Sequence, residues 1–172
     1  MTHDIAGFSG GPSTPELYWR WTELGAFTPY MRTHDGNERD ENHRWDADEE
    51  TTAHFRFFAK VHEALGPELE ALADEAAETG LPMVRHLMVE HPDDPETWPI
   101  SDQFLLGSDL LVAPITTEGA TSREAYFPEG DWFNVWDGTQ VSGPGWATVD
   151  GPVGAPPVFS RGAERTDLRS VE

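Results

Sequence analysis

The residues best suited to chemistry lie in the stretch 26–45, AFTPYMRTHDGNERDENHRW. A short extended segment there ends in Met31–His34 and leads into a loop rich in Arg, His, Asp, Glu and Asn. Alternate side chains of an extended segment share a face, so Arg32 and His34 point to the same side. In α/β folds, buried strands deliver binding and catalytic groups at their carboxyl ends, and Gly36 permits a tight turn there. We therefore expect Arg32 and His34 to line a binding site; the alternative is an ordinary solvated loop.

A serine nucleophile is a second candidate, because Gly7-Phe8-Ser9-Gly10-Gly11 matches the G-x-S-x-G motif of serine hydrolases. In that motif a helix begins directly after the serine. Here Pro12 intervenes, and the first helix-capping residues are Ser13 and Thr14. A serine hydrolase using Ser9 therefore stays an alternative, which labelling with a fluorophosphonate would detect.

Metal sites find little support in the spacing of acids and histidines. A calcium loop beginning at Asp46 would need Gly at its sixth position and Glu at its twelfth, where the sequence has Thr51 and Phe57. His54 and His62 are eight residues apart on a predicted helix, without a third partner. We expect no metal site and no cofactor.

The composition restricts the partners. The chain has 172 residues with 32 acidic and 11 basic ones, a formal net charge of −21, so nucleic acid and anionic membranes are poor partners. Lys60 is its single lysine, and such a composition is typical of a cytoplasmic protein from a high-salt organism, where salt screens the self-repulsion.

The absence of cysteine excludes disulfides and thiolate chemistry. The first residues, MTHDIAGF, lack the features of a secretory signal, and the apolar runs are too short to span a bilayer.

The first eighty residues predict an alternation of strands and helices. Asp4–Phe8 is typical of the end of a strand, and a capped helix follows with apolar residues at helical spacing up to Gly25. Thr28–Arg32 predicts the next strand. Two further helices are expected from Asp48 to Gly80, with a break at Gly66-Pro67. This order is typical of the end of a βα-repeating unit.

From Leu81 the pattern changes to short strands separated by turns rich in Gly, Pro and Asp. Aromatic pairs at 126–127 and 132–133 flank a glycine and predict a hairpin. We expect an α+β chain in which an antiparallel β-sandwich-like domain occupies 81–163, followed by a frayed tail at 164–172. The candidate strands are 83–89, 109–115, 124–127, 132–136, 147–149 and 157–159.

Several stretches carry a resemblance to a known family: Asp4-Ile5-Ala6-Gly7-Phe8, WTELGAFTPYMRTH at 21–34, PDDPET at 92–97 and GSDLLVAP at 107–114. In this order they resemble the C-terminal part of the family 31 glycoside hydrolases, the α-glucosidase and α-xylosidase family. The resemblance runs from Asp4 to about Arg161. Within the family, THDGN at 33–37 and the downstream Asn42 resemble the sulfoquinovosidase branch most.

The resemblance implies that residues 1–80 are the C-terminal end of a (β/α)8 barrel, its last two strands with their helices, and that the proximal C-terminal β domain follows. On this view Thr28–His34 is the eighth barrel strand. The family hydrolyses α-glycosidic bonds with retention, using an aspartate nucleophile and an aspartate acid/base. Both belong to motifs expected upstream of this segment, so we expect a fragment that hydrolyses nothing alone.

The resemblance also implies part of the sugar-binding wall. His34 matches the histidine that hydrogen-bonds sugar hydroxyls beside the cleaved bond, Phe8 matches the aromatic lining that subsite, and Asp4 and Arg32 are polar neighbours at its rim. The family's Asp-Ile-Gly-Gly has Ala6 at its third position here. Sulfoquinovosidases place a Tyr where this chain has Phe8, so an α-glucoside and a sulfoquinovoside both stay possible as substrates.

A non-catalytic carbohydrate-binding or interaction module is a further alternative, since exposed Trp rings stack on sugars, although at these spacings they are more often core. An isolated barrel end would also expose apolar helix faces, so we expect self-association or a partner half to cover them. The aromatic candidates are Trp132, Trp136 and Trp146, and the helix faces are Leu17/Trp21/Leu24 and Ala53/Phe57/Val61.

Overall fold

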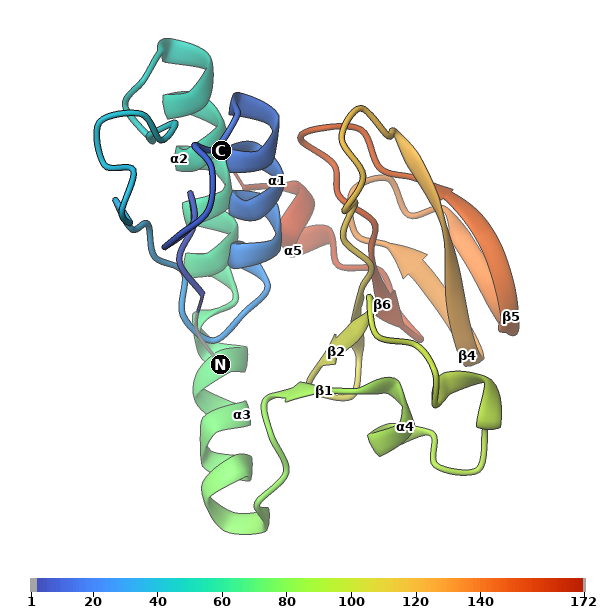
Figure 1. The fold of residues 1–172 in the computed structure, drawn as a ribbon. Coiled ribbons are helices and arrows are strands. Elements are labelled where there is room, and N and C mark those ends of the chain that lie inside the picture. The colour runs from blue at the N-terminus through green and yellow to red at the C-terminus, as the bar shows by residue number, and fades with distance from the viewer. Residues whose placement is uncertain (1–2, 172) are drawn as a thin grey trace.

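The computed structural model describes residues 3–171 and places a group of helices against one face of an antiparallel sheet (Figure 1). Helix α1 (Pro15–Ala26) begins after Thr14, whose hydroxyl accepts a hydrogen bond from the backbone N–H of Leu17 at 3.2 Å. A proline at the first helical position costs no hydrogen bond there, so the predicted start of this helix is confirmed.

Helices α2 (Glu49–Ala64) and α3 (Gly66–Thr79) follow as predicted. Asp48 caps α2 by accepting the backbone N–H of Thr51 at 2.7 Å, and the acids of the first turn favour the positive end of the helix dipole. Gly80 ends α3 with a left-handed φ of 80°, a conformation that favours glycine. Within residues 3–171, no helix is both long and apolar enough to cross a lipid bilayer.

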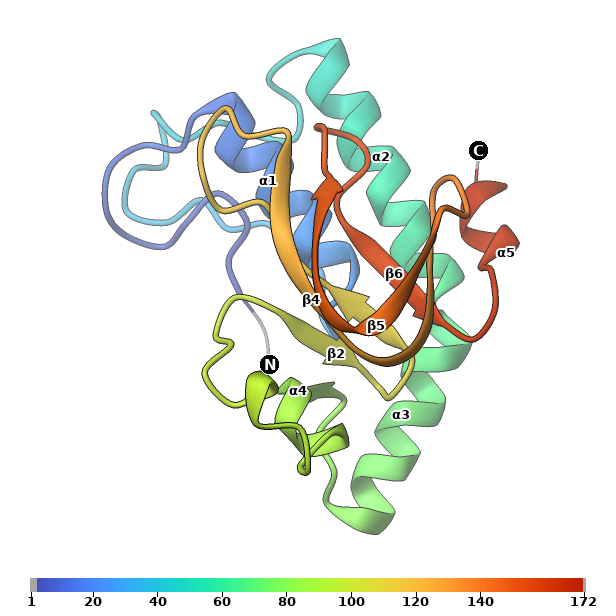
Figure 2. The same ribbon diagram turned by 90° about the vertical axis from the view of Figure 1, so that its right-hand side faces the viewer.

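The second half forms one six-stranded antiparallel sheet with the order β1-β2-β3-β6-β4-β5. In Figure 2 the long β4–β5 ribbon curves in front of β2 and β6, with α2 and α3 behind them. The antiparallel β domain expected from the sequence is thus confirmed. Its strands are β1 (Val84–Arg85), β2 (Phe104–Leu106), β3 (Leu110–Val112), β4 (Ser122–Asn134), β5 (Gln140–Asp150) and β6 (Val158–Arg161), and the short helices are α4 (Leu87–Glu90), η1 (Pro95–Thr97) and α5 (Thr166–Arg169).

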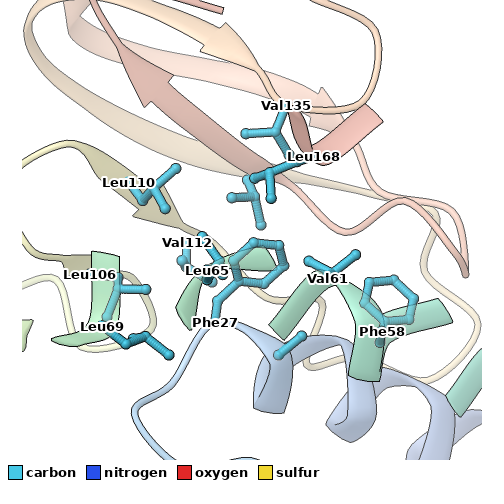
Figure 3. Packing of buried hydrophobic residues seen from close by; sticks show 12 residues of the cluster. Phe27, Phe58, Val61, Leu65, Leu69, Leu106, Leu110, Val112, Val135 and Leu168 are labelled. Carbon is cyan, nitrogen blue, oxygen red and sulfur yellow. The ribbon is translucent and has the colours of Figure 1, made fainter. Parts of the chain in front are cut away.

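Two apolar cores lie on the two faces of this sheet, because successive strand residues point to opposite sides. Leu105, Leu111 and Phe159 pack with Phe127 and Trp132 on the face beneath the β4–β5 ribbon. The alternate positions pack against the helices (Figure 3), in a cluster that includes Phe27, Phe58, Val61, Leu65, Leu69, Leu106, Leu110, Val112, Val135, Val158 and Leu168. The helical segment and the β domain therefore share one core.

The two strands predicted in the first eighty residues reduce to one parallel bridge, between Ile5 and Thr33. Pro29 has no N–H to donate to a ladder. Ala6 has a left-handed φ of 86°, which ends the extended run that begins at Asp4. Among the described residues, the first third of the chain is thus held together by the packing of helices α1 and α2 and by this bridge.

The predicted hairpin at 126–133 is instead one continuous strand, β4. Its register with β5 shifts between Phe127 and Gly130, where three residue steps on β4 oppose two on β5. The shift is a β-bulge, and Gly130, which had predicted a turn, lies in this bulge within the continuous strand. Gly143 lies opposite the bulge, and a Cβ there would come within 2.0 Å of the Pro128 carbonyl oxygen. The segment predicted as a strand at 83–89 likewise divides into β1 and the helical turn α4.

The structure also differs from the expected frayed tail at 164–172. Residues 166–169 form α5, whose Leu168 is fully buried, and the Arg165 guanidinium pairs with the Glu68 carboxylate at 2.8 Å; Glu172 lies outside the described residues. The same packing covers part of the face of α2 that was expected to be exposed, since Val61 is fully buried and Phe57 is half-buried, whereas Ala53 stays exposed. Leu17 on α1 stays exposed.

Candidate functional site

The Ile5–Thr33 bridge brings the predicted site residues together. The Ile5 N–H donates to the carbonyl oxygen of Arg32 at 3.2 Å, and the His34 N–H donates to the carbonyl oxygen of Ile5 at 3.0 Å. This pairing places the residues around Ile5 beside those around Thr33, although 28 positions separate them in sequence. Four side chains expected to form one wall, those of Asp4, Phe8, Arg32 and His34, therefore meet as two adjacent pairs.

The polar pair consists of Asp4 and Arg32. The Arg32 Nε donates to Asp4 Oδ1 at 2.9 Å, and Nη2 donates to the same oxygen. About half of the Arg32 side chain is exposed, so the ion pair contributes at most about 1 kcal/mol to stability. The pair has a second effect, which is orientation: the carboxylate fixes the guanidinium, and the Arg32 side chain stays about half exposed.

The aromatic pair consists of Phe8 and His34, whose ring centroids are 5.4 Å apart with an interplanar angle of 60°. The backbone N–H of Gly36 donates to His34 Nδ1 at 2.8 Å. Because Nδ1 is the acceptor, the neutral ring carries its hydrogen on Nε2, which becomes a donor for a ligand hydroxyl. An exposed phenyl face beside an imidazole N–H matches a sugar ring, which has apolar C–H faces and hydroxyl edges.

Two residues of the following loop hold this pair in place. Gly36 has a left-handed φ of 61°, and a Cβ there would lie 2.3 Å from the Gly7 carbonyl oxygen, so the loop passes directly against the Gly7–Phe8 backbone. The buried Asn42 amide donates to the Asp35 carbonyl oxygen at 3.0 Å and accepts the Ser13 N–H at 2.9 Å. The sequence predicted the turn at Gly36. It did not predict the two hydrogen bonds of Asn42, a residue that only the family resemblance had singled out.

The structure does not support the other candidate sites. Ser9 is exposed, and α1 begins only at Pro15, so the residues after Ser9 do not form the strand–turn–helix of a nucleophile elbow. Trp132 is fully buried and Trp136 donates to the Pro156 carbonyl oxygen within the core, while Trp146 is exposed on β5. Among residues 3–171, no group of three or more His, Asp or Glu side chains is placed to hold a metal ion.

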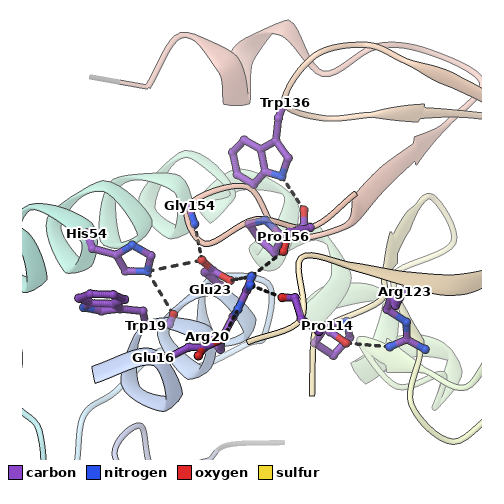
Figure 4. A network of polar contacts seen from close by, with 12 residues as sticks. Glu16, Trp19, Arg20, Glu23, His54, Pro114, Arg123, Trp136, Gly154 and Pro156 are labelled. Atoms are coloured by element: carbon purple, nitrogen blue, oxygen red, sulfur yellow. Dashed lines mark hydrogen bonds and ion pairs between the residues drawn. The ribbon is translucent and has the colours of Figure 1, made fainter. Parts of the chain in front are cut away.

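A buried polar network fixes α1 against the β domain (Figure 4). Arg20 pairs with Glu23 at 3.3 Å and donates to the carbonyl oxygens of Ala120 and Gly151, both at 2.8 Å. Burial raises the pKa of Glu23 to about 7, because desolvation outweighs the stabilising contacts with Gly154 and Arg20. Desolvation also lowers the pKa of the adjacent His54, whose Nε2 donates to the Trp19 carbonyl oxygen at 3.1 Å.

Comparison with known families accounts for almost the whole chain. Residues 1–71 match the model of the glycosyl hydrolases family 31 TIM-barrel domain, and residues 80–164 match that of the family 31 C-terminal domain. The join between the two matches falls where α3 ends and the strand-rich half begins.

Individual relatives agree with these models. The chain is 43% identical to a sulfoquinovosidase of Agrobacterium fabrum over 162 residues, 92% of this chain and 24% of that protein. It is 34% identical to alpha-glucosidase 2 of Bacillus thermoamyloliquefaciens, over 98% of this chain and 21% of that protein.

A solved structure gives the same result. The structure of a GH31 family sulfoquinovosidase from E. rectale, in complex with the aza-sugar inhibitor IFGSQ, superimposes with a TM-score of 0.87 at 32% identity. It covers 96% of this chain and 25% of that one. The chain spans about a quarter of the length of the curated relatives it matches. With both halves matched in order and the fold reproduced, the chain belongs to glycoside hydrolase family 31.

Proposed function

We propose that this chain is the C-terminal portion of a retaining α-glycosidase and supplies one wall of its sugar-binding site. The observation that carries the proposal is the Ile5–Thr33 bridge, because it brings Asp4 and Phe8 beside Arg32 and His34. A catalytic barrel needs such side chains at one edge, where its strands end.

Each side chain then has a defined task. His34 Nε2–H donates to a sugar hydroxyl, and Phe8 covers an apolar face of the ring. The Asp4–Arg32 pair offers an acceptor and donors at the rim. The nucleophile and the acid/base are two further carboxyl groups, which we place outside this chain; retaining enzymes hold these about 5–5.5 Å apart across the scissile bond.

The substrate class is an α-glycoside of glucose or of sulfoquinovose. Relatives of both kinds match this chain. The phenyl ring of Phe8 has no hydroxyl to donate to a sulfonate, whereas it covers the face of a plain glucoside equally well. The rates at which one and the same protein hydrolyses a neutral and a sulfonated aryl α-glycoside therefore have to be compared.

The test uses the chain alone and a chimera in which it replaces the matching segment of the A. fabrum sulfoquinovosidase. We expect no hydrolysis of aryl α-glucoside or aryl α-sulfoquinovoside by the chain alone, and hydrolysis of at least one by the chimera. His34→Ala in the chimera should lower kcat/KM about 100-fold, since it removes a hydrogen bond to the reacting sugar. Arg39→Ala, a change of an exposed residue in the same loop, is the matched control and should leave kcat/KM unchanged. Hydrolysis by the chain alone, or full activity of the His34→Ala chimera, would overturn the proposal.

Exposed apolar side chains near the wall support binding of a second protein chain there. Leu17, Tyr30 and Trp45 expose large apolar side chains on the helical half. A separately encoded upstream half of the barrel, or a second copy, would bury them. Sedimentation of the chain with and without the upstream part of the chimera measures this, and a monomer that fails to bind that part would contradict it.

The acidic composition supports a cytoplasmic location in a high-salt cell as part of the same proposal.

A further inference from the structure

A second cleft lies on the β domain, away from the wall of Asp4, Phe8, Arg32 and His34. It is formed by the segment of α4 and η1 on one side and by the β4–β5 ribbon on the other, and its volume is about 680 Å³. In Figure 1, α4 lies at the lower right, below the labelled ends of β4 and β5, whereas α1 lies on the opposite side of the sheet. This volume is within the range of small-molecule sites, about 300–1,000 Å³.

An exposed tryptophan ring forms one side of the cleft. Trp146 lies on β5 and is 52% exposed, although it pairs across the ladder with the buried Tyr126. The rings of these two residues meet at 5.4 Å, and the Tyr126 hydroxyl donates to Asp94 Oδ2 at 2.6 Å. The Trp146 ring is thus held by an edge-type contact with Tyr126 while about half of the side chain stays exposed at the cleft, where it can stack on a ligand ring.

The polar groups of the cleft are almost all hydrogen-bond acceptors. The carboxylates of Asp93, Glu96 and Glu129 stand at its rim and make no ion pair within the described chain. His91 also lines the cleft, and its Nε2 is buried without a hydrogen-bond partner among residues 3–171. No lysine or arginine belongs to the lining of this part of the described chain, so a sulfonate or phosphate would meet repulsion.

We propose that this cleft of the β domain binds a short neutral oligosaccharide. The apolar face of a hexose lies on Trp146, and its hydroxyls donate to the rim carboxylates. Neutral hydroxyls suit this lining because carboxylates accept several hydrogen bonds and an uncharged ring meets no repulsion. The acidic lining of the cleft therefore suits a neutral sugar and not a sulfosugar. We expect the cleft to bind a glucan chain.

The test measures binding to the 172-residue chain, so it does not depend on hydrolysis. Isomaltotriose and maltotriose are titrated to millimolar concentration, and the indole N–H signals of the seven tryptophans are followed by NMR. We expect the Trp146 signal, assigned through its loss in Trp146→Phe, to shift while that of the buried Trp132 stays in place. A sulfated glucose at the same concentrations should leave the Trp146 signal unchanged.

Three variants separate this site from a general surface effect. Trp146→Ala should weaken binding at least about tenfold, and Trp146→Phe, which keeps a ring, should stay within about threefold of the unchanged chain. The matched control is Trp45→Ala, because Trp45 is also about half exposed but lies on the helical half and does not line the cleft. Equal loss in Trp45→Ala and Trp146→Ala, or an unmoved Trp146 signal, would overturn the proposal. So would binding of trilysine in place of the sugars, because it would mark the cleft as a site for a basic peptide.

Discussion

The Glu23 carboxylate accepts a hydrogen bond of 2.6 Å from the backbone N–H of Gly154, and this contact joins α1 to the loop between β5 and β6. Only 2% of the Glu23 side chain is exposed, and its second oxygen faces Arg20. A carboxyl group therefore lies within the interface between the helical segment and the β domain, where its protonation state affects both.

The first prediction concerns the pH dependence of stability. The pKa of Glu23 is raised to about 7 in the folded chain from an ordinary value of 4.5. The folded state thus holds this proton more tightly, so the stability from Glu23 is complete below about pH 4.5 and is lost as the pH rises through about 7. We expect this loss to reach about 3 kcal/mol at most, from about 1.4 kcal/mol per tenfold difference in proton affinity. Urea unfolding at several pH values measures it. Glu23→Gln should flatten the dependence in this range, and the exposed Glu78→Gln should not; equal slopes for both variants would contradict the assignment.

The second prediction concerns the loop against Phe8. Gly36→Ala should lower the free energy of unfolding by at least about 2 kcal/mol, because its Cβ would meet the Gly7 carbonyl oxygen at 2.3 Å with φ in the left-handed region. Gly11→Ala is the control, since its Cβ meets no atom within 4 Å, and it should change stability by less than about 0.5 kcal/mol. Thermal or urea unfolding of both variants decides it, and similar stabilities would show that the loop can move aside.

The third prediction concerns the stability of the chain when Ala6 is replaced by the glycine of the family motif. Ala6 has a φ of 86°, so Ala6→Gly should stabilise the chain by about 1 kcal/mol by removing a strained Cβ. The exposed Ala53 on α2 provides a control of opposite sign, because Ala53→Gly should cost about 1 kcal/mol in a helix interior. Urea unfolding of the two variants compares them; destabilisation by both would mean that Ala6 makes contacts worth more than its strain.

The fourth prediction concerns substrate preference in the chimera with the A. fabrum protein. Phe8→Tyr should raise kcat/KM for the sulfoquinovoside about tenfold or more relative to the glucoside, because it adds a hydroxyl donor for a charged sulfonate. Tyr30→Phe removes an exposed hydroxyl elsewhere on the helical half and serves as the control. Should Phe8→Tyr raise both activities equally, the residue would act through packing rather than through the sulfonate.

The fifth prediction concerns salt. With a formal net charge of −21, the chain should unfold at a higher temperature in molar KCl than in dilute buffer, because salt screens the repulsion among its carboxylates. Calorimetry at increasing KCl measures the shift. Sucrose at matched osmolarity controls for non-ionic stabilisation, and an equal shift in sucrose would remove the case for a high-salt origin.

The helices were predictable from the sequence because their signals are local. The capping hydroxyl of Thr14, the acids after Asp48 and the stop at Gly80 each act within one turn. Arg32 and His34 were predictable from their shared face at the end of an extended segment. Asp4 and Phe8 were accessible only through the family resemblance, since the pairing of Asp4 with Arg32 spans 28 positions and no local pattern predicts it.

The errors arose where long-range contacts decide the structure. A glycine after Phe127 favours a turn locally, but pairing with β5 and β6 keeps β4 extended and turns the extra residue into a bulge. The charged tail resembled a frayed end, yet Leu168 fills a gap between the helices and the sheet. In both places burial outweighs the local preference.

The burial of Leu168 also has a consequence for biosynthesis. It completes a core whose buried helical residues before the sheet end at Leu69, about 100 residues earlier in the chain. At about 5–20 residues per second, a ribosome needs about 5–20 s to make the intervening segment. During that interval the newly made helices expose part of their apolar face, so we expect chaperones to bind the nascent chain until α5 has been made.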